Sequence, residues 1–254
     1  MSNKDDRVGE TRLNNNGEEM KIVRYGGRYD IDIQFVNDGT IVEHKRYNHF
    51  KTGNVKNPMT PSVFGVGFIG IGRFKSVDEN GKITKCYKVW ESMLQRCYDP
   101  KYQEKFPTYV GCSVCEEWHN FQVFAKWFYE NYYEFGSNEL MALDKDILKK
   151  GNKIYSADNC VFVPQSINSL FVKRNSERGE YPIGVTKHGN KFQARLNKGN
   201  RRISLGMFNT PEEAFLAYKI AKEKYIKEVA EEYKDKIPCK LYEAMVAYKV
   251  EIDD

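Results

Sequence analysis

The sequence predicts an α+β protein with a small N-terminal β module, a central β-β-α core and a C-terminal three-stranded sheet packed on a helix. Three stretches favour this class. Residues 30–35 alternate apolar and polar side chains, as half-buried strands do. Residues 143–171 follow the order strand, turn, strand, helix, and residues 181–218 form three short strands and a helix start. We expect a disordered tail at 1–19, modules at 20–75, 86–172 and 181–236, a linker at 173–180 and an extension at 237–254.

Composition limits the functional classes. The chain has 254 residues, 30% charged side chains, a mean hydropathy of −0.67 and a net charge of +5. It contains no apolar run of membrane-spanning length, and its N-terminus lacks a secretory signal, so we expect a soluble cytoplasmic protein without a membrane partner. Six cysteines in a chain of this size do not make a disulfide scaffold.

The N-terminal β module is predicted from the alternating strand and the turn at Asn37-Asp38-Gly39. Basic and aromatic residues follow it closely between His44 and Lys56. Such a stretch could bind phosphates and stack on bases, so DNA binding is one interpretation of this module. A solvated strand edge and loop is the other.

The glycines at Gly65, Gly67 and Gly70 match the pattern G-x-G-x-x-G. A dinucleotide site needs this pattern between a strand and the start of a helix. Because the turn-rich residues 78–82 follow and no helix is evident, we predict a glycine-rich turn and no small-molecule cofactor.

Two amphipathic helices are predicted in the next segment, at Tyr87–Cys97 and Trp118–Tyr132. The second has aromatic residues at the spacing of a buried helix face, which indicates core packing.

Four cysteines bear on this region. A tetrahedral Zn²⁺ could be held by a Cys-x-x-Cys pair and two flanking thiolates. Buried free thiols are the alternative. The residues concerned are Cys97, Cys112, Cys115 and Cys160.

The central core begins with Asp144 and Asp146, turns at Gly151-Asn152 and ends with the apolar segment Gln165–Phe171, which contains Asn168 and is predicted to form a short helix. A carboxylate and an amide brought together by a strand pair and a helix offer hard oxygen ligands. Such ligands suit Mg²⁺ or Mn²⁺ with positions left open for water and phosphate.

These residues resemble the ββα-metal (HNH) nuclease family, in the variant found in phage endonucleases and some rare-cutting restriction enzymes. The matching residues are Asp144-Lys145, Tyr155–Asn159 and Asn168. The resemblance implies that Asp144 and Asn168 bind the divalent metal, that Lys145 neutralises the phosphate, that Tyr155 is the general base, and that Asn159 braces the hairpin. The chain departs from the family's usual pattern at Lys145, which stands where the general-base histidine would be.

The C-terminal module has turns at residues 188–190 and 198–200 between its strands, and its helix is expected to begin at Pro211 with Thr210 as N-cap. Six basic residues and no acid lie between Tyr181 and Ser204. A local excess of this kind is typical of a nucleic-acid-binding surface.

The same module resembles the plant Apetala-type (AP2/ERF-like) DNA-binding domain, through Gly184-Val185, Lys191-Phe192, Ala194 and the run Leu205–Tyr218. That family implies that the exposed sheet face enters the major groove of double-stranded DNA. The residues in matching positions are Lys187, Lys191, Gln193, Arg195, Arg201, Arg202 and Ser204.

The sequence therefore predicts a metal-dependent, site-specific DNA endonuclease of the phage or homing type, acting on double-stranded DNA. A catalytically inactive DNA-binding regulator on the same scaffold is the main alternative. A structural protein that uses the sheet for protein contacts is a third, which the acid-free basic face disfavours.

Overall fold

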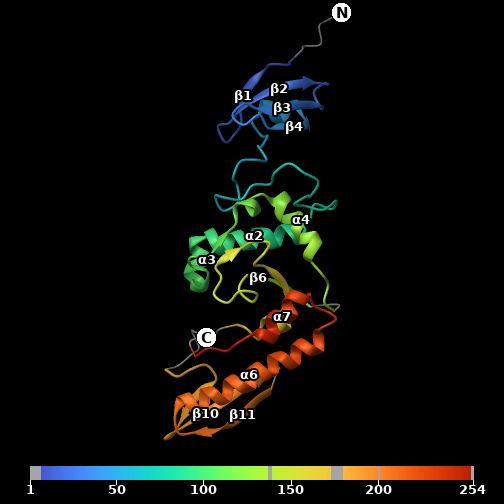
Figure 1. Ribbon diagram of the computed structural model, residues 1–254. Coiled ribbons are helices and arrows are strands. Elements are labelled where there is room, and N and C mark those ends of the chain that lie inside the picture. Colours follow the sequence, from blue (N-terminus) through green and yellow to red (C-terminus); the bar gives the residue numbers. More distant parts are fainter. Residues whose placement is uncertain (1–6, 137–138, 173–179, 200, 253–254) are drawn as a thin grey trace, which may run out of the picture. The chain divides into compact units, whose positions relative to one another are not determined.

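The computed structural model describes residues 7–136, 139–172, 180–199 and 201–252. The chain forms two compact units, Met1–Val110 with Val114–Phe128 and Gly111–Ser113 with Tyr129–Asp254. The predicted α+β class is confirmed, with a sheet in the N-terminal part of the sequence, another in the C-terminal part and mixed structure between them (Figure 1). In the described part of the chain, no helix is long and apolar enough to cross a membrane. The units divide the chain differently from the predicted domains, because residues 86–172 contribute to both of them.

The first unit begins with an antiparallel sheet in the order β1-β2-β3-β4. The alternation seen in the sequence places Ile31, Ile33 and Phe35 in a core, which Phe50 of α1 completes. The predicted β module is therefore confirmed. Its elements are β1 (Thr11–Leu13), β2 (Glu19–Tyr25), β3 (Ile31–Phe35), β4 (Ile41–Lys45) and α1 (Tyr47–Lys51).

The predicted tail at 1–19 is wrong for residues 11–13, which form β1 and pair with β2. All three residues of this short edge strand are exposed, so it has no apolar alternation by which the sequence could reveal it. Residues 1–6 lie outside the described residues.

The rest of the first unit consists of an irregular segment at residues 52–84 and a group of helices. Trp90 of α2 is fully buried, and its indole nitrogen donates to the carbonyl of Trp118 at 2.7 Å. The two predicted helices are present with slightly shifted ends. The elements are α2 (Lys85–Tyr98), α3 (Pro100–Lys105), the 3₁₀ turns η1 (Pro107–Tyr109) and η2 (Glu116–His119), and α4 (Phe121–Asn131).

The glycine-rich segment packs against these helices. A Cβ atom at Gly67 would overlap Leu94 and Trp90, and one at Gly70 would overlap Asn120. The glycines therefore permit close packing of the chain, in agreement with the prediction of a turn.

The second unit contains a hairpin of β6 (Met141–Asp144) and β8 (Val161–Pro164), which pair antiparallel with Asp144 opposite Val161. Their connection is long and includes β7 (Ile154–Tyr155), beside which the N–H of Ser113 in β5 (Ser113–Val114) donates to the carbonyl of Lys153 at 2.9 Å. The following helix α5 (Gln165–Asn168) has four residues, fewer than the seven predicted, and single turns continue it to Phe171.

The free edge of β8 is covered by side chains. The hydroxyl of Tyr133 donates to the carbonyl of Phe162 at 3.0 Å, and Nζ of Lys240 donates to the carbonyl of Cys160 at 3.0 Å. These carbonyls are two residues apart and point away from β6.

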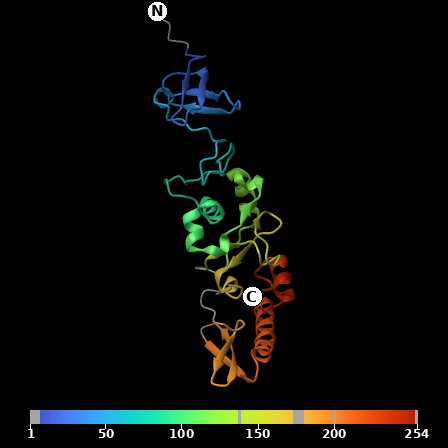
Figure 2. The same ribbon diagram turned by 90° about the vertical axis from the view of Figure 1, so that its left-hand side faces the viewer.

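The C-terminal sheet has the order β11-β10-β9 and lies along one side of α6 (Figure 2). Helix α6 begins as predicted, since Pro211 is its first residue and the Thr210 hydroxyl accepts from the N–H of Glu213 at 3.2 Å. Ala194, Leu196 and Tyr218 are buried between sheet and helix. The elements are β9 (Val185–His188), β10 (Lys191–Lys198), β11 (Arg201–Phe208), α6 (Pro211–Tyr233) and α7 (Cys239–Ala247).

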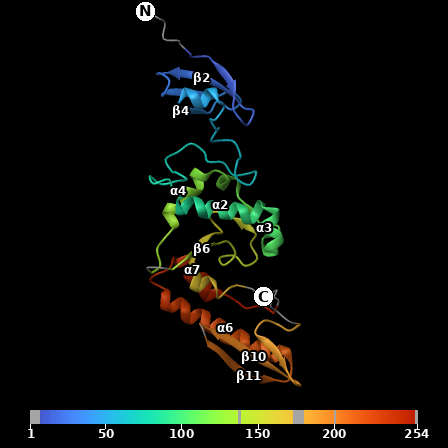
Figure 3. The ribbon, with the colours of Figure 1, turned by 180° about the vertical axis from the view of Figure 1, so that it is seen from behind.

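One core joins the hairpin to the C-terminal helices, and α7 lies next to β6 (Figures 1 and 3). Val161, Val163 and Ile167 of the hairpin region pack with Ile226 of α6 and Leu241 of α7. The predicted linker spans residues 173–180, of which 173–179 lie outside the described residues. The segments before and after it share a hydrophobic core.

Candidate active site and nucleic-acid interface

Asp144 is the last residue of β6 and is half-buried. Its Oδ1 accepts from the backbone N–H groups of Asp146 at 2.9 Å and Ile147 at 2.7 Å. This turn fixes the carboxylate at the end of the strand and leaves Oδ2 outside the turn.

Burial and the neighbouring charge of Asp146 raise the pKa of Asp144 to about 6, against the lowering effect of the two backbone hydrogen bonds. A carboxylate in this position is short of compensating positive charge. Sequence reasoning assigned Asp146 no role, although the Asp-x-Asp spacing is a signal that could have found it. About half of the Asp146 side chain, 49%, is exposed.

Lys145 is buried, with 8% of its side chain exposed, and its Nζ lies 3.4 Å from Oδ2 of Asp146. The same nitrogen lies over the ring of Tyr155, 5.7 Å from the ring centroid. Tyr155 is only 2% exposed. The structure therefore brings Lys145 and Tyr155 together, but in the interior of the second unit.

Asn152, in the predicted Gly-Asn turn, braces the loop between β6 and β7. Its side-chain nitrogen donates to the carbonyls of Lys145 and Ile154, both at 2.7 Å. Asn159 is half-buried farther along the same loop, and its bracing of the hairpin stays a prediction.

Asn168 is the last residue of α5 and is half-buried. The helix packs on β6 and β8, and its buried residue Ile167 belongs to the shared core. The structure thus brings together the elements that carry Asp144 and Asn168. Metal binding by both residues stays a prediction.

The donor set fits a hard divalent cation. Asp144 offers a carboxylate oxygen outside its turn, and Asp146 offers a second carboxylate nearby. The pKa of Asp144 is raised first by burial and then by the charge of Asp146, and a bound cation would offset both effects.

A second surface with clear chemistry is the outer face of the C-terminal sheet. The register pairs Gln193 with Thr186, Arg195 with Ser204 and Asn197 with Arg202. Because Ala194 and Leu196 of β10 are buried against α6, these residues face the other way. The outer face consists of Thr186, His188, Lys191, Gln193, Arg195, Asn197, Arg202, Ser204 and Met207.

Hydrogen bonds order this outer face. The amide nitrogen of Gln193 donates to the Ser204 hydroxyl at 3.0 Å, and Nε of Arg195 donates to Oε1 of Gln193 at 2.7 Å. Cations are present on this face and, among its nine residues, there is no carboxylate. A surface of this kind suits a polyanion that also presents hydrogen-bonding groups, as a nucleic acid does with its phosphates and base edges.

The prediction that all seven basic and polar residues share one face needs correction for two of them. Lys187 pairs with Phe192, and Arg201 pairs with Lys198. Phe192 packs in the core under α6, and Lys198 forms an ion pair with Glu228 of α6 at 2.6 Å. Lys187 and Arg201 are exposed, but their register places them on the helix side of the sheet.

The cysteines are all within the described residues, and none forms a disulfide. Cys97 and Cys115 belong to the first unit, and Cys112 and Cys160 to the second. Burial raises the pKa of Cys115 to about 11. The zinc site and the alternative of buried thiols both stay predictions.

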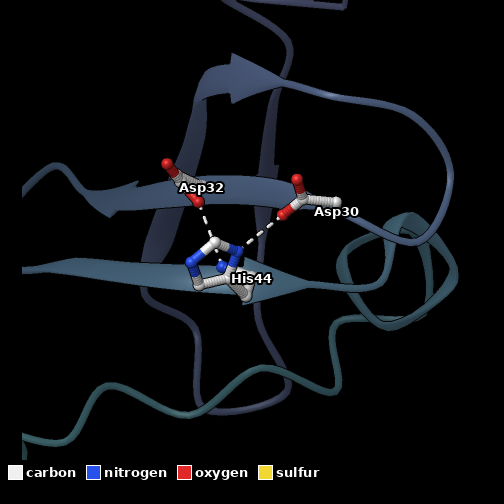
Figure 4. A group of neighbouring side chains, drawn as sticks. All are labelled: Asp30, Asp32 and His44. Carbon is white, nitrogen blue, oxygen red and sulfur yellow. Dashed lines mark hydrogen bonds and ion pairs between the residues drawn. The ribbon is translucent and has the colours of Figure 1, made fainter.

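A third cluster lies in the N-terminal sheet, where the ligand atoms of Asp30, Asp32 and His44 are within 4.8 Å of one another (Figure 4). Arg24 already binds both carboxylates, at 2.7 Å to Asp30 and 2.5 Å to Asp32, and it lowers their pKa values. His44 has a positive φ of 54° and donates its backbone N–H to Asp32. We interpret the cluster as an ion-pair network that supports an irregular strand.

The basic-aromatic stretch at His44–Lys56 is divided by the fold. Phe50 is buried, and the Tyr47 hydroxyl donates to Glu10 at 3.0 Å. Both aromatic rings therefore serve the module's own packing, and DNA binding by this stretch stays a prediction.

No protein-family model, curated protein or solved structure matches this chain. Its function is therefore inferred from its residues and their geometry.

Proposed function

We propose that the protein is a metal-dependent endonuclease that binds double-stranded DNA through its C-terminal sheet and hydrolyses a phosphodiester bond at Asp144. The observation that carries this proposal is the half-buried Asp144, held at the end of a hairpin strand beside Asp146 with a pKa raised to about 6. The resemblance of Asp144, Lys145, Tyr155 and Asn168 to the phage-type ββα-metal nucleases supports it.

Asp144 and Asn168 would hold one Mg²⁺ or Mn²⁺ ion, which supplies Lewis-acid stabilisation of the scissile phosphate. In hydrolysis the oxygen of a water forms a bond to phosphorus, one bridging P–O bond breaks, and the departing oxygen takes a proton. Tyr155 is proposed to orient the attacking water or, as its phenolate, to take the water proton, directly or through a neighbour. Lys145 supplies positive charge beside Tyr155 and Asp146.

DNA would be bound by the outer sheet face. Lys191 and Arg202 are exposed and suit phosphate contacts, whereas Gln193 and Arg195 form the hydrogen-bonded pair that suits base edges. Because the face is cationic, binding should weaken steeply with salt.

The test is cleavage of supercoiled phage and host DNA by the full chain with Mg²⁺ or Mn²⁺, followed on gels. EDTA should stop the reaction. The variant Asp144→Asn should bind DNA normally and fail to cut, and Asp158→Asn, an exposed carboxylate in the same loop, should cut like the wild type. Cleavage by Asp144→Asn at the wild-type rate would reject this site.

A DNA-binding regulator without catalysis is the second candidate. The observation that favours it is the burial of Lys145 and Tyr155, the two residues assigned to phosphate and proton transfer. A regulator would bind one sequence through the same sheet face, and neither ion would produce cleavage at any protein concentration.

A further inference from the structure

We propose that the segment Tyr248–Glu251, which follows α7, is a strap that fixes the C-terminal sheet to the hairpin carrying Asp144. The strap would set one distance between the bound DNA sequence and the cleaved bond. Only this last effect rests on the proposed function. Sequence patterns alone indicated no function for residues 237–254.

On the hairpin side, the strap contacts both ends of the central core. The ring of Tyr248 meets Phe171 edge-to-face at a centroid distance of 4.8 Å. Nζ of Lys150, in the loop after β6, donates to the carbonyl of Lys249 at 3.1 Å and lies 5.5 Å from the centroid of the Tyr248 ring. The loop that begins at Asp144 is thus attached to the strap.

On the sheet side, the strap enters the other core. Val250 is 3% exposed and packs with Val185, Ala194 and Tyr218 between sheet and helix. Tyr248 packs against this core and against the core shared by the hairpin and α7. One short segment therefore contributes side chains to both cores.

Glu223 of α6 holds the strap in place. Its side chain is 15% exposed, its Oε1 accepts from the backbone N–H of Val250 at 3.1 Å, and its Oε2 lies 3.4 Å from Nζ of Lys249. Lys219, one turn earlier, donates to the carbonyl of Val250 at 2.7 Å. The strap backbone is thus held from both sides by charge-assisted hydrogen bonds, which are stronger than neutral ones. We assign Glu223 as a positioning residue.

Two connections cross the junction between the cores. Helix α6 spans both of them, with Tyr218 in one and Ile226 in the other, and the strap crosses the junction a second time. A second connection hinders bending about a single helix. The outer sheet face and Asp144 should therefore move together, and a bound sequence would be cut at one offset.

The first experiment needs no cleavage activity. A site for a sequence-specific protease is inserted after Arg174, the full chain is cut there, and separation of the two fragments in urea is followed by gel filtration. The fragments should stay together in buffer. Glu223→Gln, and a chain ending at Ala247, should lower the urea midpoint of separation by about 0.5 M or more.

Glu212→Gln, which changes an exposed carboxylate in the first turn of the same helix, is the matched control and should leave the midpoint unchanged. Equal midpoints for the wild type and the chain ending at Ala247 would overturn the strap. Separation of the wild-type fragments in plain buffer would also overturn it.

The second experiment maps cleavage positions on an end-labelled duplex with one binding site. The wild type should give one main position, and Glu223→Gln should spread the products over neighbouring positions with at least about a twofold loss at the main one. An unchanged cleavage pattern would overturn the inference that the strap fixes the distance between the binding site and the cleaved bond. If the wild type does not cut with either ion, the proposed function fails, and the fragment experiment still decides the strap.

Discussion

Asp144, the metal ligand of the proposed site, is held in surroundings that disfavour its ionised form. Its ionised form is disfavoured by burial and by Asp146, as its raised pKa shows. A side chain that weakens the native state at neutral pH is better explained by binding than by stability. Its backbone hydrogen bonds could be made equally well by a neutral amide.

Asp144→Asn should therefore stabilise the metal-free protein. The pKa rises from 3.8 in the unfolded chain to about 6 in the folded one, so the folded state binds more protons between these values. The contribution of Asp144 to the free energy of unfolding thus falls as pH rises from about 4 to about 6, and stays low above that. At pH 7.5 the variant should gain about 1–2 kcal/mol, after allowance for partial exposure.

Urea unfolding of both proteins at pH 4 and pH 7.5 measures this difference, which should nearly vanish at pH 4. Added Mn²⁺ should raise the midpoint of the wild type and not that of Asp144→Asn. Asp158→Asn serves as control. A variant less stable than the wild type at pH 7.5 would contradict the argument.

Tyr155→Phe should slow cleavage by about 10²-fold if Tyr155 is the general base, because phenylalanine has no phenolate oxygen to take the proton from water. The ring would keep its packing and its contact with Lys145, so the fold should persist. Tyr133→Phe is the control, because the Tyr133 hydroxyl donates to the backbone carbonyl of Phe162 at the edge of β8. This variant should lower the stability and leave the cleavage rate unchanged. Single-turnover cleavage rates of the wild type and the two variants test this role. A wild-type rate for Tyr155→Phe would leave Tyr155 as a core aromatic residue.

At the scale of elements, the C-terminal sheet divides its basic residues between two faces. Arg195 lies on the outer face beside Gln193, whereas Arg201 is paired with Lys198 on the helix side. The two arginines therefore form a matched pair for testing which face binds DNA.

Arg195→Ala should weaken binding to a specific site by roughly 1–3 kcal/mol, because it removes a candidate contact to a base edge. Arg201→Ala should cost less than about 0.5 kcal/mol and should act through long-range charge alone. Fluorescence anisotropy at two salt concentrations separates the effects. Equal losses for the two variants would place the DNA elsewhere.

Local sequence signals predicted much of this sheet. The turns, the Thr210 cap and the start of α6 at Pro211 each depend on residues close in the chain. The faces of β11 could not be predicted in the same way, because a bulge at Ala194 and Arg195 shifts the register. A strict period of two fails across such a bulge.

The candidate site shows the same limit. The short strand at Asp144 and the segment around Asn168 are visible as patterns in the sequence. The burial of Lys145 against Tyr155 depends on the path of the loop between β6 and β8. Single-sequence patterns do not determine such a path, because the contacts that fix it are long-range.

At the scale of the molecule, the hairpin depends on the C-terminal helices for its core. Its buried residues Val161, Val163 and Ile167 are covered by residues of α6 and α7. A chain ending at residue 180 loses those partners and exposes the apolar side of the hairpin to water.

Deletion of Tyr181–Asp254 should therefore unfold the hairpin as well as remove the sheet. Domains are stable by only about 5–15 kcal/mol, and loss of several buried aliphatic contacts is of that size. Amide hydrogen exchange over residues 141–168 measures this, and protection should disappear in the truncated chain. Retained protection there would show that the hairpin folds alone.

The side chains that cover the edge of β8 also bear on pairing with strands of other chains. An open strand edge is a template on which another chain can add its own strand, and such additions lead to aggregates. Tyr133 and Lys240 occupy the carbonyls of Phe162 and Cys160 on that edge. An incoming strand would have to displace a phenol and a lysine before it could pair with these two carbonyls, and this hinders strand addition at the edge of β8.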